Sequence, residues 1–189
     1  MGIDLLHDVD FKKHELSINK QVVNIDGNWC FRPPKYDSYR TLKIGTTLEN
    51  ELKAAIKQRK IEMMKNGEKY LKSYVLPDRT IKQFPANESV PYQEIMLLCV
   101  SEKGKMIMPW SFPNCCVKVI REELCIELFH AHCLRHTHGT ILAENGVNPK
   151  TVMERLGHKD IATTLGKYTF NTESMKNSAV DVFENAVNR

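Results

Sequence analysis

Four residues in the last third of the chain have the chemistry needed to cut a phosphodiester bond. His132 and Arg135 lie three residues apart in HAHCLRHTHGT, so on a helix both side chains project from one face. His158 follows a glycine in LGHKD, and Tyr168 comes ten residues later in LGKYTF. The arginine and imidazoles could stabilise charge on phosphate oxygens, while the phenol could bond covalently to phosphorus. The set predicts phosphoryl transfer through a phosphotyrosine.

Each of these residues alone has a plainer interpretation. A tyrosine in a helix usually packs against its neighbours, a lone histidine is usually a satisfied surface or core group, and an H-x-x-R pair is commonly solvated. The order and spacing of all four residues favour the chemical interpretation.

Helices are predicted to position this set. One begins around His132 and closes at Gly146. Asn148 caps another, with Pro149 at its first position and Gly157 just past its end. The histidine of LGHKD is therefore expected at an exposed turn.

Two further helices are predicted beyond that turn. Asp160 can cap a short helix that leads to Tyr168. An amphipathic helix follows over residues 172–187, with Val182 and Phe183 in its apolar stripe. We expect this stripe to fold back on its own domain or to reach a neighbouring protomer.

The first third reads as strands, which predicts a three-stranded antiparallel sheet at residues 16–44. The run 16–25 alternates and is rich in β-branched residues, and Asp26-Gly27 is a strong turn signal. Residues 29–31 form the second strand and residues 39–44 the third. With a mainly helical remainder, the fold class is α+β.

The middle of the chain is less regular. Thr46 and Glu49 form a candidate capping box, and Gly67 is a plausible helix end. Residues 69–89 are polar and contain two prolines, which predicts a surface excursion. Residues 94–100 could be helix or strand.

Composition bounds the class of protein. The chain has 42% hydrophobic and 26% charged residues, as ordinary globular proteins do. A net charge of +4 permits a nucleic-acid partner without requiring one. The longest apolar run, 95–100, is too short to span a bilayer, and the amino terminus lacks signal-peptide features. We expect a cytoplasmic protein with no membrane partner.

The stretch from Phe129 to Phe170 resembles the signature region of tyrosine recombinases. It is most similar to integrases of phages and conjugative transposons, through H-x-L-R-H-T-H, V-x-x-x-L-G-H, T-T-L and the tyrosine. The resemblance implies site-specific DNA recombination through a 3′-phosphotyrosine formed by Tyr168. Arg135 and His158 would bind the non-bridging oxygens, and His132 would assist proton transfer or phosphate binding.

The resemblance extends to a β-hairpin turn that carries a lysine in this family. PPKYDSYRTLKI places Lys35 in such a turn, and it would help protonate the leaving 5′ oxygen. Relatives often carry a second lysine where this chain has Asp37, so a catalytic group is lost if that second position is the active one. Arg40 and Lys159 are expected to contact the DNA.

The implied partners are double-stranded DNA and further copies of the chain, with a tetramer on DNA for the full-length parent. The family needs no metal and no high-energy cofactor. The protein would act on DNA in the bacterial cytoplasm, associated with the nucleoid.

One part of the family pattern is not found. Gly2 to Phe11 matches the segment that follows an R-x-G-E helix in relatives, and the first arginines here, Arg32 and Arg40, lie in the hairpin. We therefore interpret residues 1–189 as a catalytic domain truncated at its amino terminus, without core-binding or arm-binding domains. The chain could be a fragment or a natural truncation, and both explanations remain open. The recombination activity of the chain alone is expected to be impaired.

Three alternatives remain open. The chain could be a catalytically inactive recombinase relic that binds DNA, or a type IB topoisomerase, which forms the same linkage. A metal site is the third alternative, because side chains that can bind metal ions are clustered, although no C-x-x-C pair supports such a site. The clustered residues are His130, His132, Cys133, His136 and His138.

Overall fold

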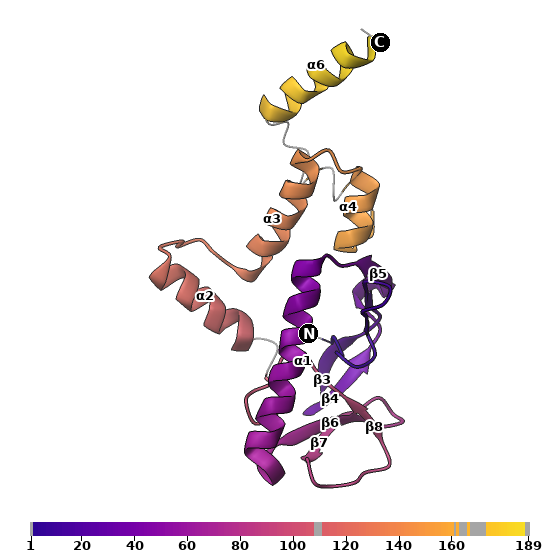
Figure 1. The fold of residues 1–189 in the computed structure, drawn as a ribbon, viewed down its shortest axis with the longest axis vertical. Helices are drawn as coiled ribbons and strands as arrows, with labels where there is room; N and C mark the ends of the chain where they lie inside the picture. The colour runs from indigo at the N-terminus through magenta and orange to yellow at the C-terminus, as the bar shows by residue number, and fades with distance from the viewer. Residues whose placement is uncertain (1, 108–110, 161, 163–165, 167–172, 188–189) are drawn as a thin grey trace. The chain divides into compact units, whose positions relative to one another are not determined.

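The computed structural model describes residues 2–107, 111–160, 162, 166 and 173–187 (Figure 1). The chain divides into two compact units, Met1–Cys115 and Cys116–Arg189. The first unit contains the strands and the long helix α1, and the second contains mainly helices. The predicted α+β class is confirmed.

The first sheet is antiparallel, with strand order β1-β2-β5. Its strands are β1 (Val9–Asp10), β2 (Glu15–Ile18) and β5 (Arg40–Lys43). Leu16 of β2 pairs with Leu42 of β5. This register places the buried Leu16 in the core.

A separate hairpin joins β3 (Gln21–Ile25) and β4 (Asn28–Arg32). Its turn is Asp26-Gly27, as predicted, and both residues have positive φ, at 49° and 83°. Positive φ at both central positions matches the right-handed twist of the flanking strands. The hairpin predicted at Asp26-Gly27 is confirmed.

The prediction of one continuous strand over residues 16–25 is wrong. The run divides at Asn19-Lys20 into β2 and β3, which pair with different partners. Lys20 Nζ donates to both carboxylate oxygens of the buried Asp8, and Asn19 Nδ2 donates to Asp8 Oδ1 at 3.1 Å. These bonds hold the junction, so residues 16–44 form a sheet and a hairpin rather than one three-stranded sheet.

The helix α1 (Thr46–Asn66) begins and ends at glycines. Gly45 is its N-cap, without a side-chain bond, so the predicted capping box of Thr46 and Glu49 does not form. Glu49 instead accepts hydrogen bonds from His14 and Lys53, which lower the pKa of the Glu49 carboxyl. Gly67, with φ of 51°, ends the helix as predicted.

A second antiparallel sheet follows, with strand order β7-β6-β8. Its strands are β6 (Leu71–Val75), β7 (Ile81–Pro85) and β8 (Gln93–Ile95). The predicted surface excursion over residues 69–89 is therefore wrong. Ser73 is buried and accepts a bond from Gln83 Nε2 at 3.0 Å, so a polar pair occupies positions where apolar side chains would have marked a strand.

Two apolar clusters form the core of the first unit. One joins the hairpin to the second sheet; its buried members are Phe31, Ile81, Ile95, Leu97 and Val100. The other joins α1 to the first sheet and contains Leu5, Leu16, Ile44 and Leu52.

The amino-terminal segment is tied to the segment around residue 96. Leu5 donates its amide to Met96 O at 2.8 Å, and Leu98 donates to Ile3 O at 3.1 Å. The buried Asp4 accepts the amide of Met96 through Oδ1 at 2.9 Å, and its own amide donates to Asp8 Oδ2 at 2.8 Å. These bonds satisfy carboxylates that would otherwise be costly to bury.

The second unit consists mainly of helices, of which α3 and α4 lie side by side (Figure 1). Their bounds are α2 (Ser111–Glu123), α3 (Ala131–Glu144), α4 (Pro149–Leu156) and α6 (Glu173–Val187). Of the described helices, none combines the length and apolarity needed to cross a membrane.

The predicted start and end of α4 are confirmed. Asn148 Oδ1 accepts the amide of Lys150 at 2.9 Å, Pro149 is the first helical residue, and Gly157 closes the helix in the left-handed region at φ 69°. These are local rules of helix termini that the sequence alone displays.

The Asp8 carboxylate provides a test of the first unit. We expect Asp8→Ala to lower the free energy of unfolding by roughly 3–5 kcal/mol, because it leaves the largely buried Lys20 ammonium and the Asp4 amide without their partner. Urea denaturation at constant m-value measures the loss. Asp10, whose side chain is 44% exposed and accepts the amides of Lys12 and Lys13, is the matched control, and Asp10→Ala should change stability much less. Equal losses in the two variants would contradict this account.

Candidate active site

The helix α3 carries two of the predicted site residues. His132 is exposed and Arg135 is partly buried, three residues further along the same helix. The His132 ring also lies near the ring of His136, with centroids 6.4 Å apart. Helical spacing alone accounts for the proximity of His132 to Arg135.

The arginine of α3 contacts the end of α4. Arg135 Nη2 donates to the carbonyl oxygen of Leu156 at 2.6 Å. Leu156 is the last residue of α4, and His158 follows after a single glycine. The structure therefore brings Arg135 beside the turn that carries His158, although the two residues are 23 positions apart in the sequence.

Packing and backbone bonds fix the position of this turn. Val152 and Leu156 are 1% and 5% exposed. They pack against apolar residues at the end of α3 and just after it, namely Leu142, Ala143 and Val147. The amides of Gly157 and His158 both donate to Met153 O, at 2.8 and 3.1 Å. The backbone that carries His158 is thus continuous with a buried helix.

A second polar contact joins the two helices. Arg155 Nε donates to His138 Nε2 at 3.1 Å. Partial burial lowers the pKa of the His138 imidazole, and the Arg155 guanidinium lowers it further. This contact was not predicted from the sequence, whose only signal was that His138 lies three residues beyond Arg135 and so on the same helical face.

The predicted nucleophile, Tyr168, lies outside the described residues, as do most residues of the helix expected between Asp160 and Tyr168. Lys159, expected to contact DNA, is described and exposed directly after His158.

The hairpin-turn lysine lies in the first unit. Lys35 is exposed in a short 3-10 turn, Lys35–Asp37, and its Nζ lies 5.0 Å from the centroid of the Tyr36 ring. Tyr36 and Asp37 have positive φ, at 61° and 51°. The predicted exposed turn is confirmed. Arg40 follows on β5, where its Nη1 donates to Ser38 O at 3.0 Å.

The clustered histidines in and before α3 are candidate metal ligands. Within the described ranges, no group of three or more His, Cys, Asp or Glu side chains is placed to hold a metal ion. His130 is instead the N-cap of α3, where its amide donates to Cys133 Sγ at 3.4 Å and its carbonyl accepts the amide of Cys133 at 2.8 Å.

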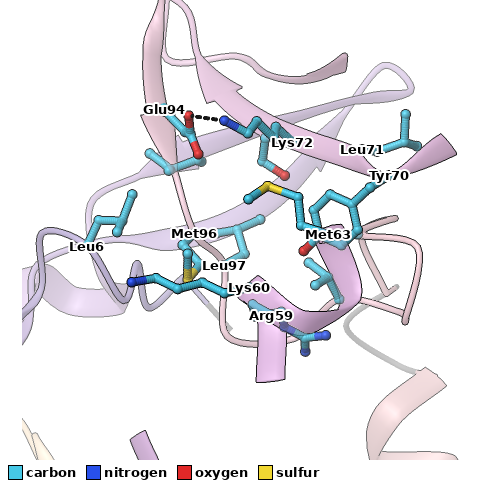
Figure 2. Close-up of a pocket in the computed structure, with 14 residues that line it drawn as sticks. Leu6, Arg59, Lys60, Met63, Tyr70, Leu71, Lys72, Glu94, Met96 and Leu97 are labelled. Atoms are coloured by element: carbon cyan, nitrogen blue, oxygen red, sulfur yellow. Dashed lines mark hydrogen bonds and ion pairs between the residues drawn. The ribbon is translucent and has the colours of Figure 1, made fainter. Parts of the chain in front are cut away.

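A cavity of about 230 Å³ lies between α1 and the second sheet (Figure 2). Its wall is mainly apolar, with Met63, Met96 and Leu97 among the lining residues. An ion pair between Lys72 and Glu94, 2.9 Å apart, lies at its edge and raises the pKa of the Lys72 ammonium. The cavity contains none of the predicted site residues, so the candidate chemistry lies elsewhere.

Comparison with known families matches most of the chain. The profile described as "Phage integrase family" covers residues 7–175. This range includes every residue predicted for catalysis or DNA contact.

Curated relatives are recombinases from bacteria and phages. The tyrosine recombinase XerC-like protein of Caldanaerobacter subterraneus subsp. tengcongensis is 31% identical over 189 residues, covering 92% of this chain and 42% of that protein. The prophage ps2 probable integrase of Lactococcus lactis subsp. lactis is 36% identical over 111 residues, covering 56% of this chain and 29% of that protein. The chain thus spans less than half the length of these relatives.

Solved structures share the fold. The Tn1549 transposon integrase in complex with transposon right end DNA superposes with a TM-score of 0.64 at 19% identity, covering 94% of this chain and 51% of that one. The XerA recombinase gives 0.55 at 16% identity, covering 95% of this chain and 50% of that one. Since the family profile spans most of the sequence and the fold agrees, the chain belongs to the phage integrase family of tyrosine recombinases.

Proposed function

We propose that this chain cleaves and rejoins DNA strands in site-specific recombination, as part of DNA integration. The observation that carries the proposal is the contact between Arg135 and the carbonyl of Leu156, which holds a guanidinium beside the turn of His158. A cation and an imidazole side by side can bind two non-bridging oxygens of one phosphate.

The reaction would proceed by attack of the Tyr168 hydroxyl on phosphorus. A bond forms between the phenolic oxygen and phosphorus, and the bond from phosphorus to the 5′ oxygen of the leaving strand breaks. Arg135 and His158 stabilise the charge on the phosphate, His132 assists proton transfer or phosphate binding, and Lys35 supplies a proton to the leaving oxygen. Attack by a second strand's 5′ hydroxyl on the phosphotyrosine restores the tyrosine.

We propose double-stranded DNA as the partner, because solved structures of this fold include a transposon integrase in complex with transposon right end DNA. Arg40 on β5 and the exposed Lys159 would contact the backbone, in agreement with the mild positive charge of the chain. Residues 1–189, with both units together, would form the catalytic domain.

The helix α6 supports self-association. Val182 and Phe183, in the stripe expected either to fold back on its own domain or to reach a neighbouring protomer, are 67% and 69% exposed. Of these two arrangements we propose the second, docking of the apolar stripe on a second copy of the chain.

A DNA-binding relic without catalysis is the second candidate. Asp37 stands in the hairpin turn where relatives often carry a lysine. The following tests separate a relic from an enzyme.

A nicked suicide substrate traps the covalent intermediate. Tyr168→Phe should abolish the protein–DNA adduct while leaving DNA affinity nearly unchanged, because only the nucleophilic oxygen is lost. The control is Tyr92→Phe, at a tyrosine stacked on Phe84 in the first unit. Adduct formation by Tyr168→Phe would contradict the assignment of the nucleophile.

The role of Arg135 is tested against a matched arginine. Arg121 Nε also donates to a backbone carbonyl, that of Phe129, at 2.8 Å. We expect Arg135→Lys to slow single-turnover adduct formation about a hundred- to a thousandfold, which is the usual effect of removing one hydrogen-bond donor to the transition state of an enzyme. Arg121→Lys should change the rate little. Similar rates of adduct formation for the two variants would show that Arg135 contributes only a structural hydrogen bond.

The 189 residues taken alone should cleave slowly. Compared with a chain extended upstream to include an R-x-G-E helix, residues 1–189 alone should form adduct roughly a hundredfold more slowly, since the added arginine would supply one more phosphate donor. They should still bind DNA weakly, with affinity that falls as salt rises. Equal adduct rates for the two chains on the same nicked substrate would contradict this proposal.

A further inference from the structure

Two consecutive residues at the end of α4 are bonded to two residues of α3. Arg155 Nε donates to His138 Nε2 at 3.1 Å, and the carbonyl of Leu156 accepts from Arg135 Nη2 at 2.6 Å. The two α3 residues are three apart and share a face. The end of α4 is therefore held at two adjacent points.

The turn with His158 cannot move independently of these points. The amides of Gly157 and His158 both return to Met153 O, one turn back in α4. Arg155 lies within that closed turn. A contact that fixes Arg155 consequently fixes the backbone of His158.

The bond requires a neutral imidazole. An arginine side chain only donates, so the acceptor must be the unprotonated Nε2 of His138. Among the described residues of α4, Arg155 is the charged group that contacts this imidazole. On α3 itself, Arg135 lies three residues before His138. Partial burial and Arg155 both lower the pKa of His138, which favours the neutral, accepting form.

We propose that His138 and Arg155 form a positioning pair that holds the His158 turn against Arg135. The pair does not touch the reacting phosphate; it acts through the backbone of residues 155–158. Its consequence for catalysis rests on the proposed function, whereas its effect on the turn does not.

The test is amide hydrogen exchange, measured by NMR on the 189-residue chain. His138→Phe keeps a ring without an acceptor, His138→Gln keeps an acceptor oxygen, and Arg155→Met removes the donor. The Phe and Met variants should lower the protection factors of the Gly157 and His158 amides about twofold to tenfold, as expected for one hydrogen bond. The Gln variant should retain protection. Lys150→Met, which removes a charge from an exposed site at the start of α4, should have no effect.

The pH dependence supplies a readout that simple destabilisation would not reproduce. A histidine with a lowered pKa in the folded state contributes stability that is present at higher pH and lost as pH falls through that pKa. The wild-type protection factors should therefore fall on acidification, and His138→Gln should lack that step. Since the two proteins differ only at residue 138, the difference between the two profiles isolates His138.

The same variants are then assayed for adduct formation. At saturating DNA, His138→Phe and Arg155→Met should lower the rate constant for adduct formation, while the DNA concentration at half-saturation stays within twofold and His138→Gln restores the rate. Unchanged Gly157 and His158 protection in both the Phe and Met variants, or the same acid step in His138→Gln, would overturn the pair. Absence of adduct from every protein, wild type included, would count against the proposed function, and the amide data would still decide on the pair.

Discussion

The last carbonyl groups of an α-helix have no partner within the helix and carry the negative end of its dipole. In α4 one of these groups, the carbonyl of Leu156, is bonded by the guanidinium of Arg135. The arrangement of the second unit around the candidate site depends on this interaction, because it connects the helix that bears His132 to the turn that bears His158. An arginine has five donors in a planar fork, so one of them can serve the carbonyl while others remain for a phosphate.

The polar contact would have little effect without the apolar one beneath it. Val152 and Leu156 are buried against residues that follow in and after α3, and this packing sets the rotation of α4 about its axis. Asn148 and Gly157 set where the helix begins and ends. Position, rotation and length together decide which carbonyl faces Arg135. The buried side chains supply most of the stabilisation, and the hydrogen bonds select the register.

Local rules account for the parts of the fold that sequence predicted. The termini of α4 and the hairpin at Asp26-Gly27 follow from the preferences of residues within a few positions of each other. The division of residues 16–25 depends on Asp8, which lies outside that run and 12 positions before Lys20. The strand β6 contains a buried Ser73, which is bonded to Gln83 on the neighbouring strand. The family signature gave the residue types of the site, but the contact of Arg135 with Leu156 depends on how two helices pack, which no spacing within one helix reveals.

The bonds between the amino-terminal segment and residues 96–98 have a consequence for biosynthesis. Asp4 and Met96 are 92 positions apart, and Ile3 is bonded to Leu98. A contact of such sequence separation forms only after a large loop has closed, which slows folding relative to locally connected structures. During translation, the bonds that Met96 makes to the Leu5 amide and the Asp4 carboxylate cannot form until residues 96–98 have left the ribosome. The amino-terminal segment is therefore one of the last parts of the first unit to reach its final contacts. The hairpin between residues 21 and 32 can form long before.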